Sequence, residues 1–138
     1  METNKIAILI KKVSLEFNKI SNPYFLKYNL SASQYKIIKY LYSQNSGTAR
    51  VVDLEKYYSM THSTTLGLLD ELEKNGYTRR VDNPNDKRGK LVALTNKAVN
   101  MKTELIKLGE DIENQLTQQL KPKEKAELTR LLLKLIKE

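Results

Sequence analysis

The residues best suited to bind a charged partner form a turn-rich stretch in the second half of the 138-residue chain. It lies between two short β-favouring runs, 77–81 and 91–94, so the pattern predicts a hairpin with a long tip. Arginine at a ribbon tip can enter the narrow minor groove of DNA, and Asp86 can orient the Arg88 guanidinium. A solvated charged loop is the alternative. The candidate tip residues are Asp86, Lys87, Arg88 and Lys90, with Gly89 for the chain reversal, and Arg79, Arg80 and Lys90 are expected to meet phosphates.

A second candidate group begins the helix predicted from Thr61 to about residue 75, immediately before the hairpin. Its polar side has small, uncharged residues in the first turns and the acidic pair Asp70 and Glu71 further on. In a helix-turn-helix, the start of the second helix contacts base edges, and its free N–H groups can bind phosphate. An ordinary exposed first turn is the alternative. The candidate DNA-contacting residues are Thr61, His62, Ser63, Thr64 and Gly67.

The elements around these groups predict a winged helix-turn-helix. A short helix at 51–58 and the turn Ser59-Met60 precede the helix that Thr61 caps, which gives two helices joined by a short turn. Gly76 suits the end of that second helix, and the hairpin follows with no intervening element. Upstream, Ser31 and Gln34 fit a capping box that starts another helix. The reading helix and the hairpin are therefore expected to lie side by side.

The two ends of the chain predict further helices. Apolar residues recur at helical spacing from residue 6 to 20, where Asn22-Pro23 is expected to interrupt the first helix. Thr95 caps one predicted long helix, and Pro122 suits the first turn of the last. The last helix is apolar around more of its surface than one packing face needs, which favours a homodimer over an intrachain core. The fold class expected is mainly α with a small β-hairpin wing, with residues 1–30 and 96–138 for dimerisation and 31–95 for DNA binding.

Composition narrows the classes of function. The chain has 24 Lys+Arg against 16 Asp+Glu, a net charge of +8, which favours a polyanionic partner. It has no cysteine, which removes thiolate catalysis and cysteine-based zinc sites, and its single histidine has no partners for a metal site. No apolar run near the start is long enough for a membrane span or a signal sequence. We expect a cytoplasmic protein that is not an enzyme, uses no cofactor or metal, and has no membrane partner.

One stretch of sequence runs from Leu69-Asp70-Glu71-Leu72 through Gly76-Tyr77, then Asn83 to Gly89, and ends in the strand that leads to Leu94-Thr95. In this motif, and in the order of helices over essentially its whole length, the chain resembles the MarR family of regulators. The resemblance implies a homodimer on a palindromic operator in double-stranded DNA, usually acting as a repressor that a small aromatic ligand releases. It also implies that Arg88 takes the wing-arginine role and Asp86 its orienting role. Many members have arginine where this chain has Gly67, which leaves the operator sequence open.

Tyrosines supply the candidate effector site. The chain has eight tyrosines, and four of them fall near the place where the resemblance implies an effector cleft. Tyrosine hydroxyls on apolar walls suit a small aromatic acid, whereas core and interface packing is the alternative for each ring. The rival function is a winged-helix protein-interaction module that does not read DNA, which the acidic residues of the reading helix favour. The candidate pocket residues are Tyr24, Tyr28, Tyr35 and Tyr42.

Overall fold

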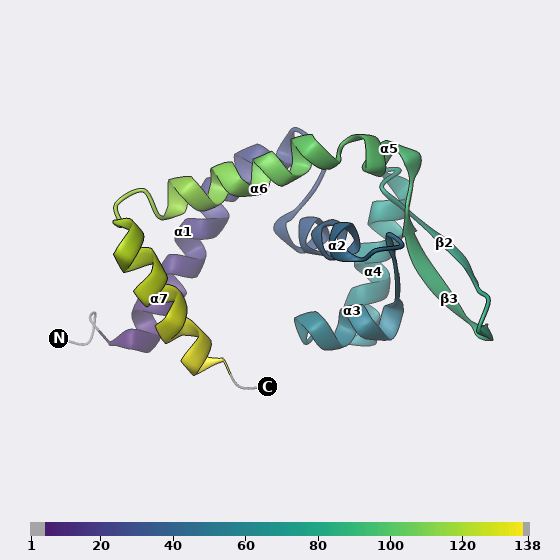
Figure 1. Ribbon diagram of the computed structural model, residues 1–138, viewed down its shortest axis with the longest axis horizontal. Helices are drawn as coiled ribbons and strands as arrows, with labels where there is room; N and C mark the ends of the chain where they lie inside the picture. Colours follow the sequence, from purple (N-terminus) through teal and green to yellow (C-terminus); the bar gives the residue numbers. More distant parts are fainter. Residues whose placement is uncertain (1–4, 137–138) are drawn as a thin grey trace.

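Helix α2 (Ala32–Ser43) lies at the centre of the computed structural model, which describes residues 5–136 (Figure 1). It begins at the predicted capping box: the Ser31 hydroxyl accepts a hydrogen bond from the Gln34 amide, and the Gln34 side chain accepts one from the Ser31 amide. Its apolar face carries Ile37, Ile38 and Leu41, all fully buried. The cap satisfies the amides that a helix start leaves free, so α2 begins at a defined residue and the other helices pack on it.

The helix-turn-helix forms as predicted from α3 (Val51–Tyr58) and α4 (His62–Lys74). Ser59 makes the turn in the left-handed region with φ 52°, and the Thr61 hydroxyl caps α4 by accepting from the Thr64 amide. Gly76 leaves α4 with φ 82°, a conformation that glycine adopts without a steric penalty. The chain then turns directly into the sheet, so α4 and the hairpin share one short connection.

The sheet has three antiparallel strands in the order β1-β3-β2. Strands β2 (Thr78–Asn83) and β3 (Asp86–Leu94) form the wing, and β1 (Thr48–Arg50) pairs with the far edge of β3. One expectation needs correction, and one strand was missed. The long hairpin tip is instead a two-residue turn, because the strands extend through most of the turn-rich stretch. The first strand was not predicted, because three residues carry no pattern of their own and β1 exists only through its pairing with β3.

Helix α1 (Ile6–Leu26) runs through Pro23, so the predicted interruption at Asn22-Pro23 is wrong. Proline inside a helix removes one main-chain hydrogen bond and costs about 3 kcal/mol. Here it falls in the last turn, and Phe25 just beyond it is buried against Tyr35, with ring centroids 4.9 Å apart. Packing of that last turn on α2 keeps it helical.

The single long helix expected after Thr95 is two helices, α5 (Asn96–Asn100) and α6 (Lys102–Leu116). Thr95 caps the first of them, as predicted. The Ala98 carbonyl accepts the Tyr42 hydroxyl at 2.5 Å and the Met101 amide at 3.2 Å. The Met101 amide is shared with the Lys97 carbonyl at 3.1 Å, a bifurcated bond typical of a helix end, and the Tyr42 hydroxyl of α2 contacts a carbonyl at this break.

Helix α7 (Pro122–Leu135) begins at Pro122, as predicted, and α6 packs beside α1 (Figure 1). Helix α7 lies at the opposite end of the molecule from the wing and has no buried residue. Its leucines are far more exposed than core leucines, for example Leu132 at 41% and Leu131 at 45%. The protomer therefore leaves a continuous apolar face on α7. In the described part of the chain, no helix is long and apolar enough to cross a membrane.

Candidate nucleic-acid interface

The beginning of α4 presents a smooth, uncharged face to solvent. The structure leaves all of the predicted residues exposed at the start of α4: Thr61, His62, Ser63, Thr64 and Gly67. The opposite face is held by Thr65, Leu69 and Leu72, which are buried against the other helices. Helix α4 thus stands with its small polar side outward, the orientation that groove contact requires.

Two of the predicted contact residues also have structural roles within α4. The Thr61 hydroxyl accepts the Thr64 amide at 3.1 Å and donates to the Thr64 hydroxyl at 2.9 Å. A helix cap of this kind contributes about 1 kcal/mol. Ser63, by contrast, makes no side-chain hydrogen bond to any residue that the structure describes. Its hydroxyl is available to a base edge or a phosphate.

His62 is tied to the helix before it. Its Nδ1 lies 2.5 Å from a carboxylate oxygen of Glu55 on α3, and the imidazole itself is largely exposed. The ring therefore links the start of α4 to α3 while most of its surface stays exposed to solvent. Among residues 5–136 with described side chains, no cluster of three potential metal-binding side chains occurs.

The acidic residues of α4 are engaged by neighbours. Asp70 accepts a hydrogen bond from Arg80 on β2 at 2.8 Å, and Glu71 accepts one from Gln34 on α2 at 3.1 Å. Arg80 thereby offsets the charge of Asp70 and also links α4 to the wing. The pair is too exposed to add much stability, since exposed ion pairs contribute at most about 1 kcal/mol. Its effect is to reduce the negative potential beside the candidate contact face.

The base of the wing is basic. Arg79 is exposed and forms no ion pair within the described residues, so its guanidinium can meet a phosphate. Arg80 is held by Asp70, and Lys90 pairs across the hairpin with Asp82. The Lys90 ammonium lowers the pKa of the Asp82 carboxyl, chiefly through their hydrogen bond. Of the three cations predicted to meet phosphates, only Arg79 has no carboxylate partner among the residues that the structure describes.

The tip residues are only partly described. Asp86 begins β3 and is exposed, one turn beyond the end of β2. The side chains of Lys87 and Arg88 lie outside the described part of the chain. The orienting contact from Asp86 to Arg88 and the minor-groove role of Arg88 therefore stay predictions.

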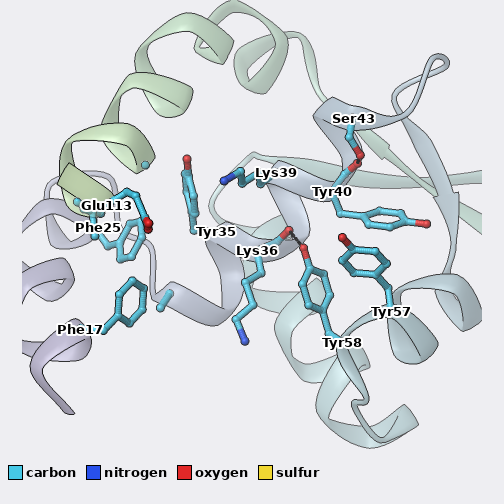
Figure 2. Close-up of a pocket in the computed structure, with 13 residues that line it drawn as sticks. Phe17, Phe25, Tyr35, Lys36, Lys39, Tyr40, Ser43, Tyr57, Tyr58 and Glu113 are labelled. Carbon is cyan, nitrogen blue, oxygen red and sulfur yellow. Dashed lines mark hydrogen bonds between the residues drawn. The ribbon is translucent and has the colours of Figure 1, made fainter. Parts of the chain in front are cut away.

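A cavity of about 420 Å³ lies between α1, α2, α3 and α6. Figure 2 shows Phe17, Phe25 and Tyr35 at one end and a tyrosine cluster at the other, with two lysines of α2 between them. The Tyr57 ring meets the Tyr40 ring at a tilt and the Tyr58 ring edge to face, with centroids 4.9 Å apart in both pairs. The Tyr58 hydroxyl donates to the Lys36 carbonyl at 2.7 Å. Burial raises the pKa of Tyr58 to about 12. The cluster and the lysines are Tyr40, Tyr57, Tyr58, Lys36 and Lys39.

Of the four tyrosines predicted to line an effector pocket, only Tyr35 lines this cavity. Tyr24 and Tyr28 donate instead to Gln115 and Glu104 of α6, and Tyr42 donates to the Ala98 carbonyl. These three hydroxyls connect neighbouring elements, a packing role rather than a place in the wall of the cavity. The sequence signal that was overlooked is the spacing Lys36, Lys39 and Tyr40, which places all three on the less apolar side of α2.

A helix-turn-helix that leads directly into an antiparallel sheet with a protruding hairpin defines this protein as a winged helix-turn-helix. The MarR family model matches residues 30–90, which span the helix-turn-helix and most of the wing. The "Multiple antibiotic resistance protein MarR" of Escherichia coli is 31% identical over 129 residues, covering 93% of this chain and 88% of that protein. The chain belongs to the MarR family, and its relatives include the HTH-type transcriptional repressor YetL of Bacillus subtilis, 30% identical over 83 residues, 60% of this chain and 50% of that protein.

Solved structures agree with this assignment. A mutant of E. coli MarR complexed with operator DNA has a TM-score of 0.87 and 30% identity, covering 99% of this chain and 96% of that one. The apo form of wild-type MarR gives a lower TM-score, 0.75, with 96% and 97% coverage. BpsR of Bordetella bronchiseptica, at 22% identity and a TM-score of 0.86 with 96% and 94% coverage, supports the fold alone. The chain is thus closer in shape to the DNA-complexed form of MarR than to its apo form.

Proposed function

We propose that this protein is a homodimeric regulator that binds a palindromic operator and represses transcription there. Helix α4 enters the major groove with Ser63, Thr64 and Gly67 against base edges, while Thr61 and His62 lie beside the phosphates. The wing follows the backbone with Arg79 and its lysines and inserts Arg88 into the minor groove. Because its target is chromosomal DNA, we place the protein in the cytoplasm.

The observation that carries the proposal is the outward face of α4. The side chains of this face are small and uncharged at the start of α4, where a base edge would lie. Further along, the carboxylates of Asp70 and Glu71 are bonded to Arg80 and Gln34. A protein-interaction module that no longer reads DNA was favoured by the acidity of α4. That argument weakens once both carboxylates have partners, and the likeness to MarR in complex with operator DNA favours DNA binding.

Salt-dependent binding to the DNA upstream of the protein's own gene tests the proposal. The logarithm of the affinity should fall linearly with the logarithm of salt concentration, with a slope of about −0.9 for each phosphate neutralised. A protein that shows no salt-sensitive binding to this duplex would refute the function. Co-purification with a protein partner and no footprint would favour the interaction module.

Arg88→Ala tests the wing. It should weaken operator binding by about 1–3 kcal/mol, because one minor-groove contact is lost in each half-site. Lys134→Ala, which removes a cation from α7 at the other end of the molecule, is the matched control and should leave affinity unchanged. Equal affinity for Arg88→Ala and the wild type would remove Arg88 from the interface.

The dimer in this proposal rests on the apolar face of α7 and the exposed apolar residues of α1. Residues 1–30 and 96–138 form the dimerisation region, and residues 31–95 form the DNA-binding region. Leu128, Leu131 and Leu132 are all more than 40% exposed in the protomer, whereas the leucines of the hydrophobic core are buried. Exposed apolar faces of this extent mark protein interfaces, and two-fold homodimers are the commonest assembly.

The cavity beside α2 is the proposed effector site. Its aromatic walls suit a flat ring, and Lys36 and Lys39 supply positive charge for a carboxylate. Benzoate should therefore bind and weaken operator binding, and Lys36→Ala with Lys39→Ala should abolish that response. If benzoate, 4-hydroxybenzoate and 2-hydroxybenzoate all leave operator binding unchanged in the wild type, the effector part of the proposal fails.

A further inference from the structure

Neither packing nor backbone conformation within the described protein requires a glycine at position 67. Gly67 lies in the middle of α4, where glycine costs helix stability relative to alanine. Gly47 and Gly76 have positive φ angles, and a Cβ on Gly109 would strike Tyr35. A Cβ built on Gly67 meets nothing within 4 Å, and its backbone is not left-handed. No contact or backbone conformation among the described residues therefore requires glycine at position 67.

The outside of α4 at this point is the DNA-contacting face of the proposed function, on which the inference rests. Ser63 and Glu71 lie one turn before and one turn after Gly67 on the same side of the helix, and all three are exposed. Glu71 is held toward Gln34, and Ser63 has no side-chain hydrogen bond within the described residues. The missing side chain thus leaves a notch on α4, bounded by Ser63 and Glu71 with Gly67 as its floor.

The chemistry of the notch selects its occupant. In the interior of a helix the main-chain N–H and C=O groups are already used in the helical ladder, so Gly67 offers no hydrogen bond. It offers an apolar floor with room for about one methyl group. The 5-methyl of thymine is the apolar group that base pairs display in the major groove. We propose that the Gly67 notch receives the 5-methyl group of one thymine in each half of the operator.

The inference predicts opposite effects of Gly67→Ala on stability and on binding. The alanine methyl meets no protein atom, so it should raise the melting temperature by about 3 °C through helix propensity alone. The same methyl fills the notch, so affinity for the wild-type operator should fall about tenfold. If Gly67 were only tolerated, alanine would stabilise the fold and leave DNA binding equal or tighter.

A methyl exchange between protein and DNA is the sharpest test. A duplex is first selected from a random library with the wild-type protein, and each thymine of its half-sites is then replaced in turn by deoxyuridine. At one position, loss of the methyl should weaken wild-type binding about fourfold, the worth of one buried methyl group. The same duplex should restore most of the affinity of Gly67→Ala. Asn114→Ala, an exposed helix-stabilising change on α6, is the control and should raise the melting temperature without altering affinity.

The outcomes separate the inference from the function beneath it. Failure of the wild type to select any inverted repeat refutes DNA binding itself. Selection by the wild type with undiminished affinity of Gly67→Ala refutes the notch. A weakened Gly67→Ala that no deoxyuridine duplex rescues refutes thymine as its occupant and overturns the proposal.

Discussion

The contact between Tyr35 of α2 and Gly109 of α6 joins the DNA-binding region to the proposed dimerisation region, and it can be tested by adding one methyl group. A Cβ on Gly109 would lie 2.4 Å from the Tyr35 hydroxyl oxygen and 3.2 Å from the ring carbon that bears it. The Tyr35 side chain is buried, and its hydroxyl donates to the Leu105 carbonyl at 2.6 Å. Gly109→Ala must therefore displace the hydroxyl and break its hydrogen bond.

The cost follows from three opposing contributions. Overpacking a core position costs about 1–3 kcal/mol, loss of a buried hydrogen bond costs about 1 kcal/mol, and alanine regains about 1 kcal/mol of helix propensity. Gly109→Ala should thus lower the free energy of unfolding by about 2 kcal/mol. Tyr35→Phe removes the obstructing oxygen and should cost about 1 kcal/mol alone. In the double variant the clash with the hydroxyl oxygen is gone and the 3.2 Å approach to the ring carbon needs only a small ring shift, so its cost should be near zero and the coupling about 3 kcal/mol.

Urea unfolding followed by circular dichroism measures these four free energies. All four proteins are compared at one protein concentration, because the stability of a dimer depends on its concentration. Additive effects of Gly109→Ala and Tyr35→Phe would refute the reasoning, since they would show that the hydroxyl does not oppose the new methyl. A stabilised Gly109→Ala would refute it equally.

Three further predictions concern pH, charge and assembly. Burial raises the pKa of Tyr42 and of Tyr58 to about 12 in the folded protein, whereas unfolded tyrosine titrates near 10, so their contribution to stability is complete below pH 10 and is lost between about pH 10 and 12. Urea unfolding across this range should show the loss, and replacing both with phenylalanine should flatten it. Asp70→Asn should free its arginine partner on β2 and steepen the salt dependence of DNA binding by about one phosphate per subunit; an unaltered slope would contradict that freeing. Leu132→Glu should convert the dimer to a monomer in light scattering while Lys134→Glu does not, and a dimeric Leu132→Glu would exclude α7 from the interface.

Local signals predicted the helix-turn-helix closely. The capping box at Ser31 and Gln34, the cap at Thr61 and the terminating Gly76 each act through neighbours a few residues away, so the sequence contains the whole interaction. The errors share the opposite property. Strand β1 depends on pairing with β3 more than forty residues later, and the break between α5 and α6 involves a hydroxyl from α2. The helix through Pro23 depends likewise on packing against α2.

In the candidate site, too, the features set by local sequence were predictable, whereas those set by distant partners were not. The exposed residues of α4 were predictable, because helical periodicity separates an outward face from a buried one. The partners of Asp70 and Glu71 were not, since Arg80 and Gln34 lie on other elements. The cavity tyrosines were missed for a related reason: Tyr40 on α2 meets Tyr57 and Tyr58 on α3 only after the helices fold together.

The junction between α4 and the wing has a consequence for the spacing of the operator. Tyr77 is buried and donates to the Tyr28 carbonyl at 2.6 Å, and the Thr95 hydroxyl donates to the Gly76 carbonyl at 2.6 Å. The joint from which both reading elements emerge is thus clamped from two sides. Within each subunit, α4 and the wing therefore keep a fixed separation and orientation relative to one another. If one base pair is inserted between the major-groove and minor-groove contacts of a half-site, either α4 or the wing can bind its groove, but not both at once.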